Sequence, residues 1–109
     1  MMIEVNGVRY PVIGVYDSVN GNGTTPCKVI ELYSTYEEVA NVFVNGVKWK
    51  YIERHDMDPE NPEVIEEEVV DCSLYSIPGP ITDYRNGRIK FEMLQASMED
   101  ILKMFEEVL

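Results

Sequence analysis

The sequence has few of the residues from which most catalytic and metal sites are built. Its 109 residues include one histidine and two cysteines, and Cys27 and Cys72 stand far apart with no CxxC pair. A zinc site needs several such ligands at close spacing, so we expect both thiols to lie reduced in the core. His55 stands beside Asp56 but has no recognisable nucleophile near it in the sequence. These absences predict a protein without enzymatic activity and without a cofactor.

Basic residues are also scarce. Nine lysines and arginines stand against 20 acids, which gives a net charge of −11. Direct binding to nucleic acid depends on basic side chains that displace counterions, so the composition argues against it. The charge is concentrated, because the stretch from Glu53 to Asp71 holds nine acids and a single base, Arg54. The expected counterparts of this stretch are basic proteins, cations, or a nucleic-acid-binding site that its acids would imitate.

Long apolar runs are absent too. No run approaches the roughly 20 residues that span a bilayer, and the first ten residues lack the pattern of a secretion signal. We therefore expect a cytoplasmic protein that does not bind membranes. The hydrophobic fraction of 45% is enough for one folded core, and 109 residues are too few for two ordinary domains. Residues 1–109 are expected to form a single domain.

An Asn-Gly pair near the start predicts a β-hairpin, because both residues readily take the positive φ angles of a type I′ turn. The hairpin covers residues 3–10 and turns at Asn6-Gly7. In this register Glu4 lies opposite Arg9 on one face, and apolar pairs lie opposite each other on the other face. Pattern and turn therefore agree on the same pairing.

A second Asn-Gly pair, Asn86-Gly87, predicts a hairpin over residues 81–93. This register places Arg85 opposite Arg88, and facing like charges are destabilising. Either nearby acids and water offset the repulsion between the two arginines, or the two guanidinium groups bind a small anion or a carboxylate at the hairpin tip.

The rest of the chain predicts further strands and two helices. Alternating apolar residues predict strands at residues 27–33, 47–53 and 66–77. The last of these strands is expected to turn Val70, Cys72 and Leu74 inward and to end at the break Pro78-Gly79-Pro80.

The helices are expected from Ser34 or Thr35 to Asn45-Gly46, and from Ser97 to about Leu109. Exposed loops are expected over residues 17–26 and 54–63. The sequence thus predicts an α+β fold, with an antiparallel sheet of about six strands built from hairpins and two short helices packed on one face.

The acidic loop contains a pattern typical of calcium ligands. Four acids fall at positions 1, 3, 5 and 12 of a calcium loop, namely Asp56, Asp58, Glu60 and Glu67. Against this hypothesis, the sixth position is Asn61 instead of glycine, and strands instead of helices flank the loop. The alternative interpretation is a solvated acidic loop that binds no metal.

Two stretches, Ile3–Tyr10 and Ile77–Gly87, are similar to small uncharacterised proteins of Firmicutes prophages and mobile elements. The resemblance implies an accessory or structural role and carries over no functional residues. The sequence therefore predicts a non-catalytic interaction or assembly protein that binds a protein partner or copies of itself. The expected contact residues are Glu60, Glu63, Glu66, Glu67, Glu68, Arg85 and Arg88. The alternatives are an acidic mimic that occupies a nucleic-acid-binding site through Asp56–Asp71, and a calcium-binding module.

Overall fold

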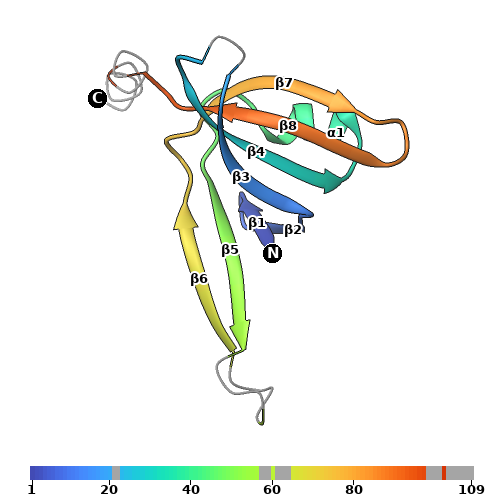
Figure 1. Cartoon of the computed structure of the whole chain (residues 1–109), viewed down its shortest axis with the longest axis vertical. Helices are drawn as coiled ribbons and strands as arrows, with labels where there is room; N and C mark the ends of the chain where they lie inside the picture. The colour runs from blue at the N-terminus through green and yellow to red at the C-terminus, as the bar shows by residue number, and fades with distance from the viewer. Residues whose placement is uncertain (21–22, 57–59, 61–64, 98–101, 103–109) are drawn as a thin grey trace.

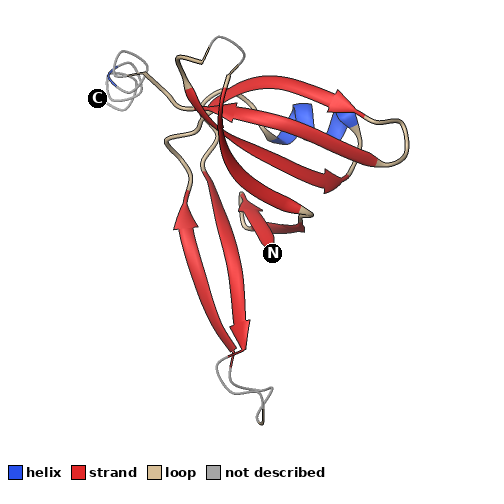
Figure 2. Ribbon diagram, viewed as in Figure 1, coloured by secondary structure: helices blue, strands red, loops and turns tan. Residues whose placement is uncertain are grey.

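The computed structural model describes residues 1–20, 23–56, 60, 65–97 and 102 of the chain. Within these residues there are eight strands and one α-helix of seven residues (Figures 1 and 2). They are β1 (Met2–Val5), β2 (Val8–Pro11), β3 (Gly14–Val19), β4 (Pro26–Tyr33), α1 (Tyr36–Val42), β5 (Trp49–Asp56), β6 (Ile65–Asp71), β7 (Ile77–Asp83) and β8 (Arg88–Leu94).

The strands form two antiparallel sheets of four strands each, in the orders β2-β1-β5-β6 and β3-β4-β8-β7. The expectation of one six-stranded sheet under two helices is therefore wrong, and the fold is closer to all-β. Local alternation predicts strands but does not determine which strands pair, and the β1–β5 and β4–β8 pairs join distant segments. The second predicted helix, Ser97–Leu109, falls almost entirely outside the described residues.

The first hairpin has the predicted register. Glu4 pairs with Arg9, and the turn residues Asn6 and Gly7 have φ angles of 53° and 78°. These angles are those of a type I′ turn, whose twist matches that of the flanking strands. The hairpin prediction is confirmed.

Helix α1 begins where the sequence predicts but ends earlier. The side chain of Thr35 accepts a hydrogen bond from the backbone N–H of Glu38, as an N-cap does. The helix ends at Val42 instead of Asn45, because Phe43 leaves helical geometry and packs into the core. Its ring lies 5.9 Å from that of Trp49 and 4.6 Å from that of Phe91, measured between centroids.

The hydrophobic core lies between the two sheets and α1. The first sheet contributes residues such as Trp49, the second contributes residues such as Phe91, and Phe43 of the helix end contacts both rings. The indole N–H of Trp49 donates to the carbonyl of Tyr75 at 2.9 Å, so the one polar atom of this ring is satisfied. The core cluster consists of Ile3, Val5, Ile30, Leu32, Val39, Phe43, Val47, Trp49, Cys72, Ile89, Phe91 and Met93.

Both cysteines are free and buried, as predicted. Burial is the main cause that raises the pKa of the Cys27 thiol and of the Cys72 thiol. Neither thiol is therefore poised as a nucleophile.

The predicted break at Pro78-Gly79-Pro80 is wrong, because β7 runs through it. β7 is an edge strand, where proline is tolerated, and its register with β8 shifts between Pro78 and Ile81. A Cβ on Gly79 would overlap the Leu94 side chain and approach the Glu92 backbone oxygen at 3.2 Å. Glycine therefore allows this irregular strand to lie close against β8.

Other predicted boundaries also differ. β5 extends to Asp56, three residues into the loop predicted at residues 54–63. β3 extends to Val19, three residues into the predicted loop, and pairs with β4 as far as Pro26. β6 ends at Asp71 instead of residue 77. Of the three residues expected to face inward, Cys72 is buried, whereas Val70 and Leu74 are 40% and 57% exposed. No helix among the described residues has the length and apolar character needed to cross a membrane.

Candidate functional site

The β5–β6 hairpin extends away from the body of the molecule (Figure 2). β1 pairs with β5 only as far as Met2 and Ile52, whereas β5 and β6 remain paired out to Asp56 and Ile65. We call the described residues 53–56, 60 and 65–70 the arm. Its projection is consistent with a radius of gyration of 15.5 Å, against about 13 Å for a compact chain of this length.

The arm carries acids on both of its faces. The register places Glu67 opposite Arg54 and Glu68 opposite Glu53. Because side chains alternate along a strand, Glu66 and Glu68 lie on the face opposite to that of Glu67. Glu66, Glu67 and Glu68 are all exposed, and β6 is an edge strand of its sheet. The arm therefore presents carboxylates beside the outer edge of β6.

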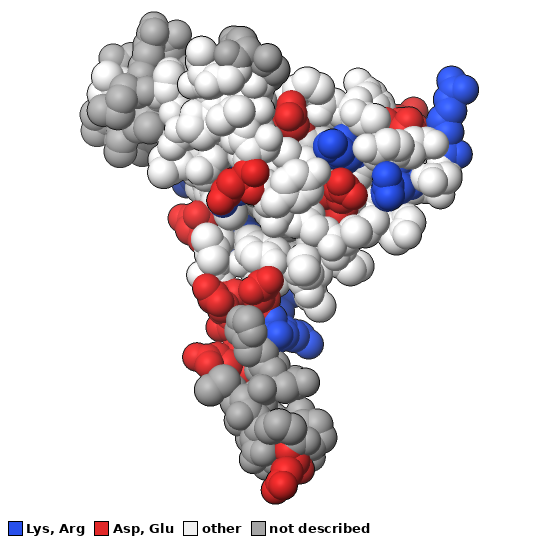
Figure 3. All heavy atoms as spheres, in the orientation of Figure 1, with Lys and Arg blue, Asp and Glu red and all other residues white. Residues whose placement is uncertain are grey.

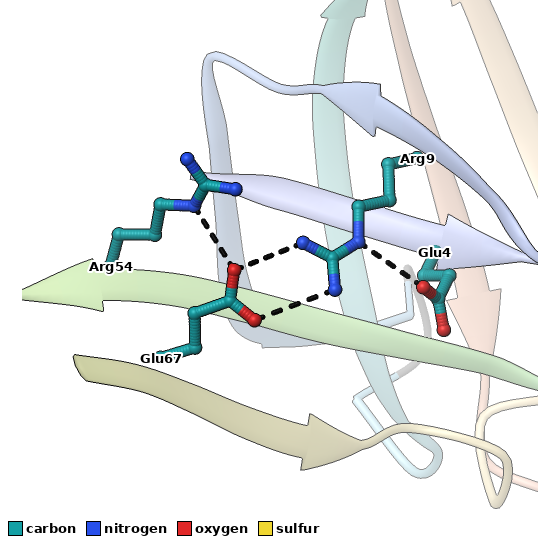
Figure 4. Close-up of polar contacts among 4 residues, drawn as sticks. All are labelled: Glu4, Arg9, Arg54 and Glu67. Carbon is teal, nitrogen blue, oxygen red and sulfur yellow. Dashed lines mark hydrogen bonds and ion pairs between the residues drawn. The ribbon is translucent and has the colours of Figure 1, made fainter. Parts of the chain in front are cut away.

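An ionic network fastens the arm to the body (Figure 4). Arg9 on β2 reaches across to β6, where its Nη1 and Nη2 donate to the two carboxylate oxygens of Glu67 at 3.0 and 3.4 Å. Its Nε donates to Glu4 on β1 at 3.2 Å, and Arg54 on β5 donates to Glu67 at 3.1 Å. This network contains one side chain from every strand of the first sheet.

The network changes the ionisation of its members. The hydrogen bonds from Arg9, followed by the charges of Arg9 and Arg54, hold the pKa of Glu67 below its ordinary value. The same contact with Glu67, assisted by Glu4, raises the pKa of Arg9. Glu67 is thus a structural carboxylate that orients the arm.

The base of the arm has a second polar contact. The hydroxyl of Tyr51 donates to Glu53 at 2.5 Å. Burial, followed by this hydrogen bond and the charges of Glu53 and Glu68, raises the pKa of Tyr51 to about 12. The phenol therefore remains a donor to Glu53 at neutral pH, where two glutamates face each other across the strands.

The predicted calcium ligands are only partly within the described residues. The backbone of Asp56 ends β5, Glu60 is exposed, and Asp58 and the contact residue Glu63 lie outside the described residues. Glu67 uses both of its oxygens to bind guanidinium groups. In the described part of the chain, no three histidine, cysteine or acidic residues gather as a metal site would require. Calcium binding stays a prediction.

The second hairpin has a register different from the predicted one. Asp83 pairs with Ile89, Thr82 pairs with Lys90, and a four-residue loop replaces the predicted two-residue turn. Two side chains cause the change: the Asp83 carboxylate accepts from the N–H of Arg85 at 2.8 Å, and the Asn86 side chain accepts from the N–H of Arg88 at 3.1 Å. The predicted facing of Arg85 and Arg88 is therefore wrong.

These residues nevertheless form a distinct surface, which we call the tip: Tyr33, Tyr84, Arg85 and Arg88. Arg88 pairs with Tyr33 of β4, and its guanidinium lies 4.3 Å from the centre of the Tyr84 ring. Tyr33 is 75% exposed and Tyr84 is 39% exposed. The sequence did not indicate Tyr33, because only the pairing of β4 with β8 brings it beside the arginines.

The described residues also line a depression of about 380 Å³ near the chain's C-terminal part. Its lining supplies hydroxyl, amide and apolar groups and no acid, base or thiol. The residues are Thr24, Thr25, Pro26, Ile77, Leu94, Gln95, Ala96 and Ser97. It lacks the acid–base pairs that mark a reactive site.

In the part of the chain that the structure describes, the arm and the tip thus have the most distinct chemistry. Figure 3 shows acidic side chains along the arm with basic ones beside them, and several basic side chains, with acidic ones between them, toward the end of the β7–β8 hairpin. The arm suits basic groups, and the tip suits a carboxylate beside an apolar side chain. Comparisons of the chain with models of protein families, with curated proteins and with solved structures gave no match.

Proposed function

We propose that this chain is a non-catalytic interaction or assembly protein that meets a protein partner through its arm, as an accessory protein of a phage or mobile element would. The observation that supports the proposal is the projection of the arm beyond the sheet together with its attachment to the body. No described residue of the arm beyond Ile52 belongs to the core cluster. The arm is nevertheless held in place, because Arg9 binds Glu67. A carboxylate-rich hairpin held away from the body is suited to contact with another molecule.

The chemistry of the arm defines the partner. The exposed carboxylates of Glu66 and Glu68 favour lysine and arginine side chains. Two exposed valines, Val69 and Val70, follow these acids on the same edge strand and add apolar contact area. A partner with a basic surface interrupted by apolar side chains matches both properties.

A pair of charge reversals tests this proposal. The tagged chain is used to capture proteins from an extract of its native host, at about 50 mM and about 500 mM salt. Glu66→Lys on the arm is compared with Glu37→Lys on α1, since both residues are exposed acids and both substitutions change the charge equally. We expect a captured protein that is lost with Glu66→Lys, kept with Glu37→Lys and reduced at the higher salt.

The outcomes separate the alternatives. Capture that is indifferent to Glu66→Lys would refute the arm as the contact surface. A captured nucleic-acid-binding protein that DNA or RNA displaces from the chain would instead identify an acidic mimic. Circular dichroism of both variants shows whether each retains its fold, and Glu37→Lys is expected to cost up to about 1 kcal/mol because it places a positive charge in the first turn of a helix.

A further inference from the structure

The tip holds two arginines, Arg85 and Arg88, whose polar contacts differ from those of Arg9 and Arg54. Neither Arg85 nor Arg88 takes part in an ion pair within the described residues, whereas Arg9, Arg54 and Lys28 all do. The Nε of Arg88 is buried and has no hydrogen-bond partner among the described groups. In a chain with a net charge of −11, unpaired guanidinium groups on one loop indicate a surface for an external carboxylate.

The backbone of the tip supports the same reading. Arg85 has a φ of 61°, a left-handed conformation that glycine adopts with less strain. The Asp83 carboxylate accepts a hydrogen bond from the N–H of Arg85, and among the described residues it makes no ion pair with the guanidinium, so the Arg85 side chain remains for outside contacts. An arginine at a position that suits glycine is explained if its guanidinium has a binding role.

The tip is also fixed in shape. The N–H of Ser34 donates to the carbonyl of Gly87 at 3.0 Å, which joins the end of β4 to the β7–β8 loop. Arg88 is stacked on Tyr84, and Tyr33 lies beside it with most of its ring exposed. Tyrosine and arginine held in one place are the residue types that most often dominate binding energy at interfaces.

We propose that the tip binds the arm of a second copy of this chain. This contact rests on the proposed assembly function, and it makes the tip the surface that the arm binds. The arm supplies what the tip lacks: exposed carboxylates on Glu66 and Glu68, and beside them the exposed side chain of Val70 on the same face. Guanidinium groups of the tip pair with the carboxylates, and an exposed tyrosine ring covers the valine.

The contact is between copies and not within one chain. Figure 1 shows the arm leaving the body in a direction different from that of the β7–β8 loop, so an arm does not reach its own tip. Every copy carries both surfaces, and arm and tip are different patches. Repetition of the contact therefore produces a chain of copies or a closed ring.

The oligomeric state of the full chain tests the inference by sedimentation and light scattering over a range of concentrations. At about 20 mM salt we expect a mass above that of one copy, which falls toward one copy at about 500 mM salt. Arg85→Gly keeps the loop conformation because glycine tolerates its φ, and it should lower the association constant about tenfold. Glu66→Arg should have the same effect from the arm side.

Charge exchange gives the decisive comparison. Glu66→Arg and Arg85→Glu each place like charges in the contact, whereas a chain with both substitutions restores opposite charges and should recover association to within roughly threefold of the original. Glu37→Lys is the control and leaves association unchanged. A chain that remains a single copy at low salt overturns the inference, as does association that survives both single substitutions. If the chain is a single copy but still captures a host protein through Glu66, the inference fails while the proposed function stands.

Discussion

Phe43 provides the most direct test of how the two sheets share one core. Its ring is 5% exposed and contacts Trp49 of the first sheet and Phe91 of the second. Replacement of a buried phenylalanine by alanine costs about 3–5 kcal/mol, because burial is lost and a cavity remains. Phe43→Leu keeps most of the apolar volume but loses two aromatic pairs of about 0.5–1.5 kcal/mol each, so it should cost about 1–3 kcal/mol.

These values are large for a domain of this size. A total stability of about 5–15 kcal/mol means that Phe43→Ala removes a substantial part of it. At about 4 °C per kcal/mol for a chain near 100 residues, the Tm should fall by about 12–20 °C. The chain has one tryptophan, and its ring lies 5.9 Å from Phe43, so urea unfolding followed by tryptophan fluorescence reports on this contact directly.

Tyr36→Ala is the matched control on the same helix. Tyr36 is 54% exposed, and its loss should change the free energy of unfolding by no more than about 0.5 kcal/mol. A cost below about 1 kcal/mol for Phe43→Ala would refute the reasoning, because it would mean that α1 does not pack between the sheets.

Three further predictions follow from the described contacts. Gly79→Ala should destabilise the fold by about 1–3 kcal/mol, because β7 lies close against β8 at this residue. Gly14→Ala, whose added Cβ meets no atom within 4 Å, should stabilise the fold by about 0.4–1 kcal/mol. Chemical denaturation measures both changes, and equal effects would contradict this prediction. The pKa of Tyr51 is raised above that of the unfolded chain, so its contribution to stability is present below pH 10 and lost as the pH rises toward about 12; absorbance at 295 nm should show a phenol titrating near pH 12 that Tyr51→Phe removes. The thiols of Cys27 and Cys72, buried and with raised pKa values, should react with a thiol reagent far more slowly in the folded protein than in denaturant, and rapid reaction of either would disprove their burial.

The sequence predicted local structure well where one turn decides it. Asn6-Gly7 set the register of the first hairpin, and Thr35 set the start of α1. The same reasoning failed at Asn86-Gly87, because the side chains of Asp83 and Asn86 capture backbone N–H groups and lengthen the loop. Side-chain capture of this kind competes with the turn preference of the dipeptide.

The pairing of distant segments was beyond local reasoning. Nothing near β1 in the sequence indicates that it pairs with β5, and this pairing divides the strands into two sheets. The candidate site shows the same limit. The acids of β6 were visible as a charge run, but the contact of Arg9 with Glu67, 58 residues away, appears only in the folded chain.

The arm can be altered without touching the interior of the domain. Trp49 and Cys72 belong to the core cluster, and no described residue from 53 to 68 does. Evolution, or an experimenter, is thus free to lengthen, shorten or replace this hairpin while the two sheets keep their packing. A change in this hairpin would therefore alter the surface that we propose for partner binding and leave the packing of the two sheets as it is.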